Sequence, residues 1–239
     1  MPQVSTGAVE FRHVSFGYSP KHQLMHDVNI TVKSGQKVAI VGPTGAGKTT
    51  LINLLMRFYD VDGGSILVDG VDTKEMTRHE LRDRFGMVLQ DAWLFEGSIR
   101  DNIAYAQDNL PEEKIIAAAR SASVDSFIKT LPGGYDFELS TGAENISQGQ
   151  RQLLTIARAM ASDPEIMILD EATSNVDTHT EQLIQKALAK LMHGRTSFVI
   201  AHRLSTIRDA DMILYMEHGD ILEHGSHEEL MAQHGKYEA

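Results

Sequence analysis

A glycine-rich segment carries the first chemical signal in this sequence. It follows the pattern GxxxxGK[ST] with the residues Gly42, Pro43, Thr44, Gly45, Ala46, Gly47, Lys48 and Thr49. The apolar run Val38–Val41 precedes it, and a stretch with helical spacing, TTLINLLMRF, follows it. In this context, N–H groups of the loop and of the helix start can point at phosphate oxygens. Lys48 would reach the β- and γ-phosphates of a nucleoside triphosphate, and Thr49 would ligate Mg²⁺.

Thr50 directly follows this phosphate loop and is included in the predicted nucleotide site. The alternative interpretation of the segment is a glycine-rich turn with a chance lysine. The strand pattern before the loop and the helix pattern after it disfavour that interpretation, because the motif requires both of them.

Two adjacent acids, Asp170 and Glu171, follow the buried run IMIL. In open α/β sheets, ligands bind outside the carboxyl ends of the strands. Neighbouring strand residues point to opposite sides, so the two acids are expected to have different roles. We assign Asp170 to the Mg²⁺ ligands and Glu171 to orienting or deprotonating the attacking water. Alone, such a pair would indicate a solvated turn or a helix cap, but beside a phosphate loop it indicates nucleotide hydrolysis.

The segment ISQGQRQ, from Ile146 to Gln152, precedes the apolar helical stretch LLTIARAMA. With the motifs above, it resembles the ATP-binding cassette (ABC) family, specifically the nucleotide-binding domain of ABC exporters. The motifs keep the family's order over nearly the whole chain. The resemblance implies that a signature of four residues binds the γ-phosphate of ATP held by a second cassette: Ser147, Gln148, Gly149 and Gln150. Ser147 can also cap a helix whose positive end attracts an anion.

The resemblance also implies roles for residues whose types alone say little. Tyr18 would stack on adenine, and His202 would contact the γ-phosphate. Gln90 would join Thr49 and Asp170 around Mg²⁺, sense the attacking water and link the site to a transmembrane partner. The catalytic residues would then be Glu171, His202, Lys48 and Gln90. Without the resemblance, Tyr18 would be a strand-end tyrosine, and an isolated His or Gln would be structural or solvated.

A loop that joins the two active sites across a dimer interface is implied at Ser174, Asn175, Val176 and Asp177. One position departs from the family pattern, because the usual signature LSGGQ has glycine where this chain has Gln148. Glycine allows positive φ and close backbone approach, and glutamine loses both. Since Glu171 is retained, this asymmetry favours one half of a heterodimeric exporter. A tolerated substitution in a homodimer is the alternative.

The elements that must position these residues alternate along the chain. Strand patterns occur in VEFRHVSF and VNITV, in a hairpin at Ser65–Val71, and at Ile166–Leu169, Ser197–Ala201 and Met212–Met216. The pattern predicts an α/β fold: a P-loop NTPase core with a mostly parallel sheet flanked by helices, an N-terminal antiparallel β-subdomain and an inserted α-helical subdomain. We expect one nucleotide-binding domain over residues 1–239, with the core at 1–96 and 162–239 and the helical subdomain at 97–161.

Composition excludes several classes of protein. The 239 residues include 22 Lys and Arg against 33 Asp and Glu, a formal charge of −11, which argues against nucleic acid as a partner. The absence of Cys excludes disulfides, Cys-ligated zinc and thiol catalysis. No signal peptide is recognisable, and no window approaches about 18 consecutive apolar residues. We therefore expect that the chain does not itself cross a membrane.

The resemblance implies that ATP binding, with Mg²⁺, closes a dimer of cassettes and that hydrolysis reopens it. This cycle would drive export of a small molecule, drug, lipid or peptide. The partners would be a second nucleotide-binding domain and a transmembrane domain, expected on the same longer chain. The soluble domain would lie on the cytoplasmic face of the cell membrane. One alternative is a non-transport ABC ATPase, but such proteins carry a long coiled coil or two cassettes on one chain, and this sequence has neither. The other is a regulatory ATP-binding module, in which Glu171 or His202 would be replaced.

Overall fold

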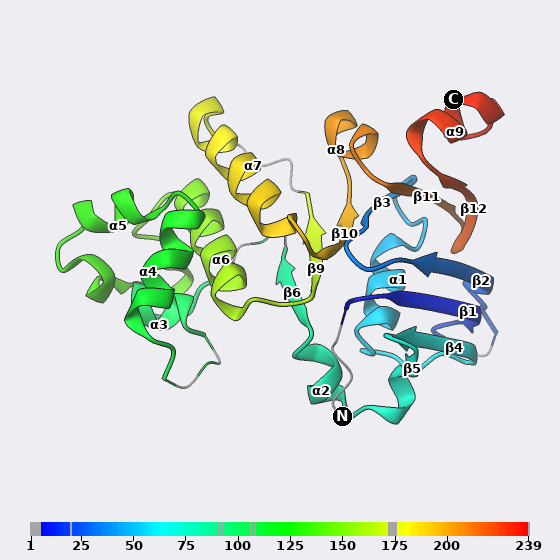
Figure 1. The fold of residues 1–239 in the computed structure, drawn as a ribbon, viewed down its shortest axis with the longest axis horizontal. Helices are drawn as coiled ribbons and strands as arrows, with labels where there is room; N and C mark the ends of the chain where they lie inside the picture. The colour runs from blue at the N-terminus through cyan, green and yellow to red at the C-terminus, as the bar shows by residue number, and fades with distance from the viewer. Residues whose placement is uncertain are drawn as a thin grey trace. The chain divides into compact units, whose positions relative to one another are not determined.

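The structure is a computed structural model that describes all residues except 1–5, 20, 90, 92, 106, 108, 172–175 and 239. The described residues form two compact units (Figure 1). The first unit takes its residues from Met1–Phe85, Glu165–Glu171 and Gly194–Ala239, and the second from Gly86–Pro164 and Ala172–His193.

A mostly parallel sheet forms the centre of the first unit. Its strands are β3 (Lys37–Val41), β9 (Ile166–Asp170), β10 (Thr196–Ile200), β11 (Met212–Glu217) and β12 (Asp220–Gly225). They lie in the order β12-β11-β3-β10-β9, and β12 alone of these five is antiparallel to its neighbour. The strands β3, β9 and β10 are almost entirely buried, which explains their unbroken apolar runs. The predicted parallel strands are confirmed, and β11 and β12 form a hairpin.

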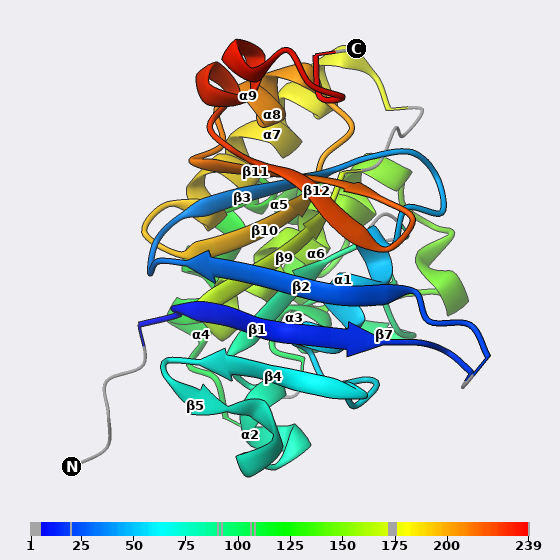
Figure 2. The ribbon, with the colours of Figure 1, turned by 90° about the vertical axis from the view of Figure 1, so that its right-hand side faces the viewer.

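The antiparallel sheet of the first unit consists of β1 (Val9–Phe16), β2 (Met25–Val32), β4 (Gly63–Val68) and β5 (Val71–Asp72). Figure 2 shows β2, β1 and β4 side by side, in the order β2-β1-β4-β5. The predicted hairpin is confirmed, because Val68 pairs with Val71 across a turn in which Asp69 and Gly70 both have positive φ.

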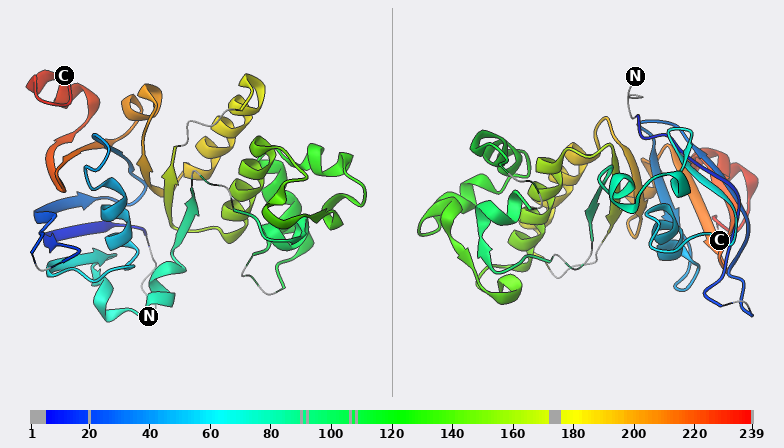
Figure 3. Two further views of the ribbon diagram at one scale, coloured as in Figure 1. Left: turned by 180° about the vertical axis from the view of Figure 1, so that it is seen from behind. Right: turned by 90° about the horizontal axis from the view of Figure 1, so that it is seen from below.

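Short helices complete the first unit. They are α1 (Lys48–Leu55), the 3₁₀ helix Thr73–Glu75, α2 (Arg78–Arg82), α8 (Leu204–Arg208) and α9 (His227–Gln233). Figure 3 (left) shows α1, in light blue, against the strands of its unit, where it buries Leu51, Leu54 and Leu55. A capping box starts α9, since Ser226 and Glu229 each bond the other's backbone.

The second unit is mainly helical. Its helices are α3 (Ile99–Ile103), α4 (Glu112–Ser121), α5 (Asp125–Thr130), α6 (Gln148–Ser162) and α7 (Thr178–Met192), with 3₁₀ helices at Gly134–Asp136 and Thr141–Ala143 and a ribbon of β7 (Gly97–Ser98) and β8 (Glu138–Leu139). The strand β6 (Phe85–Val88) begins at the last residue of the first unit. The helical run that the sequence indicates between Pro111 and Pro132 is divided into α4 and α5, because Ser123 adopts φ +61° between them.

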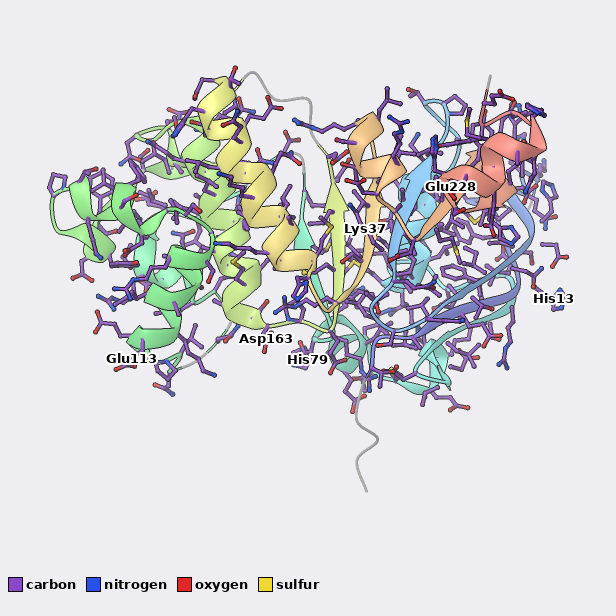
Figure 4. All side chains as sticks on the ribbon, turned by 45° about the horizontal axis from the view of Figure 1, so that its top comes forward. His13, Lys37, His79, Glu113, Asp163 and Glu228 are labelled. Atoms are coloured by element: carbon purple, nitrogen blue, oxygen red, sulfur yellow. The ribbon has the colours of Figure 1, made fainter. Side chains whose placement is uncertain are left out.

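Charged side chains cover the outside of each unit. His13, His79, Glu113, Asp163 and Glu228, labelled in Figure 4, are all exposed. Within the described part of the chain, every helix is too short or too polar to span a membrane.

Candidate active site

The phosphate loop, residues 42–49, connects β3 to α1. Gly47 precedes α1 as its N-cap with φ +99°, a conformation that only glycine adopts readily. The Lys48 ammonium bends back over the loop and donates to the carbonyl oxygens of Gly42, at 2.7 Å, and Pro43, at 2.9 Å. Burial lowers the pKa of Lys48, and the negative charge of Asp170 partly offsets this effect. The loop therefore holds a fixed cation beside a helix N-terminus.

The register of the parallel sheet brings the predicted residues to one edge. Ile200 of β10 pairs with Ile40 of β3 on one side and with Asp170 of β9 on the other. At about 4.8 Å between strands, Asp170 lies roughly 10 Å from the end of β3, where the phosphate loop begins. His202 follows β10, and its Nε2 lies 3.8 Å from Oδ1 of Asp170. This edge therefore combines the loop cation, a carboxylate and an imidazole.

Glu171 is buried, with 7% of its surface exposed. Its carboxylate accepts hydrogen bonds from the backbone N–H groups of His202, at 3.1 Å, and Arg203, at 3.2 Å, and from the hydroxyl of Thr206. Its own N–H donates to Ile200. Asp170 and Glu171 thus have different surroundings. Thr206 was not among the predicted site residues, and only its place shortly after His202 could have indicated it.

Tyr18 presents an aromatic ring, 58% exposed, in the same unit. Its hydroxyl lies 2.9 Å from Oγ1 of Thr50, the residue after the phosphate loop. Phe16 and Tyr59 meet the ring edge to face, with centroids 5.0 and 5.3 Å away and interplanar angles of 81° and 88°. The ring is therefore held in one orientation by two neighbours that sequence reasoning did not find.

The signature segment starts α6 in the second unit. Ser147 is the N-cap, and its side chain and that of Gln150 form a capping box, so the predicted cap is confirmed. Gln148 is the first residue of α6 and does not have positive φ. The prediction that glutamine would deprive this position of a needed positive φ is therefore wrong. Gln148 is exposed at the helix start, where its side chain still prevents the close backbone approach that glycine allows.

The position that requires glycine is the next one. A β-carbon on Gly149 would lie 2.3 Å from Cγ2 of Thr180 and 3.0 Å from Cγ1 of Val176, because α6 and α7 pack closely there. Asp177 caps α7 by accepting from the N–H of Thr180, and this bonding lowers the pKa of Asp177. Val176 and Asp177 thus lie beside the signature segment within the second unit.

The sequence profile of the ABC transporter family matches residues 25–174. The chain belongs to the ABC transporter family. Proteins of this family hydrolyse ATP to drive transport. The family assignment also confirms the predicted α/β P-loop NTPase fold class and the use of ATP.

Individual ABC transporters align with nearly the whole chain. A "Fatty acid ABC transporter ATP-binding/permease protein" of Mycobacterium bovis is 55% identical over 232 residues, which cover 97% of this chain and 37% of the relative. An "ATP-dependent lipid A-core flippase" of Desulfotalea psychrophila is 49% identical over 231 residues, covering 97% and 40%. The solved structure of a bacterial Atm1-family ABC exporter with ATP bound matches with a TM-score of 0.89 and 42% identity, covering 99% and 41%. The chain thus spans less than half the length of these ABC transporters.

Some predicted residues lie outside the described part of the structure. They are Gln90, Ser174 and Asn175. The roles that the resemblance to ABC exporters implies for them stay predictions.

The residues present fit a magnesium ion that binds together with nucleotide phosphates. Thr49 is exposed at the start of α1, and Asp170 lies at the same edge of the sheet, so both offer the hard oxygen ligands that Mg²⁺ prefers. Among the described residues, no group of three or more His, Asp or Glu side chains could hold a metal by itself. Mg²⁺ usually keeps several waters and binds through one or two protein ligands plus substrate phosphates, which matches this set.

Proposed function

We propose that the chain is the ATP-hydrolysing motor domain of an ABC exporter, and that Lys48, Asp170, Glu171 and His202 form its catalytic centre. One observation carries the proposal: the sheet register gathers groups from the ends of three parallel strands at one edge. The cargo would be a small molecule, drug, lipid or peptide. A fatty acid transporter and a lipid A-core flippase among the relatives support a lipid.

In the proposed mechanism, ATP enters the phosphate loop and Lys48 exchanges the carbonyl oxygens of Gly42 and Pro43 for the β- and γ-phosphates. Thr49 and Asp170, with Gln90, would hold Mg²⁺, which neutralises charge on the phosphate oxygens when it is bound. The ring of Tyr18 would stack on adenine.

Glu171 would orient the attacking water and accept its proton, while His202 would hydrogen-bond the γ-phosphate. Attack by the water oxygen forms a bond to the γ-phosphorus, and the bond from that phosphorus to the β,γ-bridging oxygen breaks. The products are ADP and inorganic phosphate. The 3.8 Å between His202 and Asp170 supports a common centre for these steps.

A second nucleotide-binding domain would complete the site. Ser147, Gln148, Gly149 and Gln150 would approach the γ-phosphate of the partner's ATP, and the loop at residues 174–177 would lie at the interface. The helix start at Ser147 supports this role, because free N–H groups at a helix N-terminus attract anions. The exposed Gln148 side chain favours a heterodimer. The partner would then be a different cassette, whose own signature could approach the γ-phosphate of ATP on this chain more closely.

A transmembrane domain on the same longer chain would be the second partner and would place this domain at the cytoplasmic face of the membrane. The name "ATP-binding/permease protein" of a relative supports the fusion. The second unit also exposes Leu89, Trp93 and Tyr105, with exposed fractions of 47%, 60% and 48%. The rings of Trp93 and Tyr105 lie 6.4 Å apart, and an exposed apolar patch is typical of an interaction site.

The test compares the wild-type transporter, with both cassettes present, with its Glu171→Gln variant. We expect Glu171→Gln to bind MgATP with unchanged affinity and to lose at least about 100-fold in phosphate release, the order of effect of a general base. Glu113→Gln, on the exposed start of α4, is the matched control and should keep full turnover. Unchanged turnover in Glu171→Gln would remove Glu171 from the proposed role, and loss of ATP binding in the wild-type chain would refute the nucleotide site.

Light scattering on Glu171→Gln with and without MgATP tests the partner. Blocked hydrolysis should trap any closed pair of cassettes. A monomer that binds ATP supports the heterodimer, whereas an ATP-dependent dimer would show that a second copy suffices.

A further inference from the structure

The Glu171 carboxylate is held by one side chain from a different element. Its Oε2 accepts from the backbone N–H groups of His202 and Arg203, while its Oε1 accepts from Thr206 on α8. Thr206 has an exposed fraction of 8% and Glu171 of 7%, so their contact is shielded from water. A hydrogen bond to a charged group is stronger than one between neutral groups, and burial strengthens it further.

We propose that Thr206 is a positioning residue for ATP hydrolysis: its hydroxyl fixes the Glu171 carboxylate against the segment that carries His202. The proposal rests on the proposed function, in which Glu171 activates the attacking water. Thr206 itself touches neither the nucleotide nor the water. It acts through the orientation of Glu171.

The position of Thr206 makes it a rigid donor. A threonine in a helix commonly bonds a carbonyl oxygen one turn earlier in the same helix. Thr206 instead directs its hydroxyl to a residue 35 positions earlier in the chain. Its β-branched side chain has few rotamers, so the direction of the hydroxyl depends on the position of α8.

The contact also couples the two proposed catalytic groups. His202 and Arg203 lie directly before α8, and their N–H groups and Thr206 bind opposite oxygens of the same carboxylate. A displacement of His202 would therefore change the orientation of Glu171. A water placed by Glu171 must lie within about 0.5 Å of its productive position, so loss of one anchor lowers turnover and leaves ATP binding intact.

Thr206→Val tests the proposal, because valine keeps the shape and removes the donor. We expect kcat to fall about ten-fold, equivalent to about 1.4 kcal/mol in activation free energy, with the Kd for ATP unchanged within about two-fold. Thr206→Ser, which restores the hydroxyl, should recover kcat to within about three-fold of wild type. Turnover is measured at saturating MgATP in the full-length transporter assembled with its partner cassette, since the second cassette completes the site.

Thr196→Val is the matched control. Thr196 is a fully buried threonine at the opposite end of β10 and accepts from the N–H of Gly35 at 2.9 Å. Its replacement should lower the unfolding temperature and keep kcat. An equal fall of kcat in Thr196→Val and Thr206→Val would show a general loss of packing and overturn the proposal.

A double-mutant cycle with Glu171→Gln tests whether Thr206 acts through Glu171. We expect Thr206→Val to have less than about a two-fold effect on the residual turnover of Glu171→Gln, because the group it positions is gone. The proposal would be overturned if Thr206→Val lowered turnover ten-fold both in the wild-type protein and in Glu171→Gln. It would also be overturned if Thr206→Val kept full turnover while Glu171→Gln was inactive. Full turnover of Glu171→Gln, or no turnover of the wild-type transporter with both cassettes present, would instead refute the proposed function on which it rests.

Discussion

Replacing Tyr18 by alanine should weaken ATP binding without disturbing the fold. The ring is 58% exposed, so its removal exposes little new core surface and should change the free energy of unfolding by less than about 1 kcal/mol. Stacking of a base on an aromatic side chain contributes about 1–3 kcal/mol. The aromatic neighbours of Tyr18 orient the ring before ATP arrives, which supports a value near the middle of that range.

A loss of about 2 kcal/mol corresponds to a Kd for ATP about 30-fold higher. Tyr18→Phe is the control for the hydroxyl, which lies 2.9 Å from Thr50. The phenyl ring still stacks, so its Kd should stay within about five-fold of wild type, since a neutral hydrogen bond contributes about 1 kcal/mol or less here.

Titration calorimetry with two ligands separates the base from the phosphates. Tyr18→Ala should bind Mg²⁺-tripolyphosphate, which has no base, with wild-type affinity and MgATP about 30-fold more weakly. An unchanged Kd for ATP would refute stacking on Tyr18. Equal weakening for both ligands would show that the substitution distorts the phosphate loop through Thr50.

Three further predictions concern other contacts within the two units. Gly219→Ala should lower the free energy of unfolding by about 2–4 kcal/mol in urea titration, because Gly219 has φ +92° and a β-carbon there would lie 1.9 Å from the carbonyl oxygen of the residue before β2. It should also weaken ATP binding, because the N–H of Gly219 bonds the phosphate loop. Arg158→Ala should shift the emission of the single tryptophan, Trp93, to longer wavelength and keep the Kd for ATP, because Arg158 donates to the Trp93 carbonyl at 3.0 Å; an unchanged spectrum would contradict this. Burial raises the pKa of Asp125, but the hydrogen bonds from Lys129 and Tyr135 and the charges of Lys129 and Arg120 together outweigh it and hold this pKa below its ordinary value. The stabilisation from these contacts is therefore present above about pH 4 and is lost as the pH falls. Asp125→Asn should therefore cost about 1 kcal/mol at pH 7 and less at pH 3 by urea titration, and an equal cost at both would refute the reasoning.

Local features of the fold could be predicted from consecutive residues. The capping boxes at Ser147 and Ser226, the hairpin at Asp69 and Gly70 and the apolar parallel strands depend on neighbours a few positions away. The turn at Ser123 could not be predicted in this way, because a non-glycine residue with positive φ leaves little trace in helical spacing.

The types of the candidate catalytic residues were also predictable, since the phosphate loop and the adjacent acids each form a short continuous motif. Their partners were not. Thr206 lies 35 positions from Glu171, and Tyr59 lies 41 positions from Tyr18, so their contacts depend on the order and register of elements rather than on spacing.

At Gln148 the sequence suggested a structural cost that the tertiary structure places at the next residue. The sequence alone marked it as a departure from the family pattern and suggested a backbone cost, but its helical conformation requires no glycine. The packing of α6 on α7 places that requirement on Gly149, where a β-carbon would meet Thr180. The sequence by itself determined which motifs and local elements this ABC transporter domain contains, because these depend on short-range hydrogen bonds and periodicity. Only the tertiary structure decided which side chain holds Glu171 and which glycine is indispensable, because both depend on distances between residues that are remote in the chain.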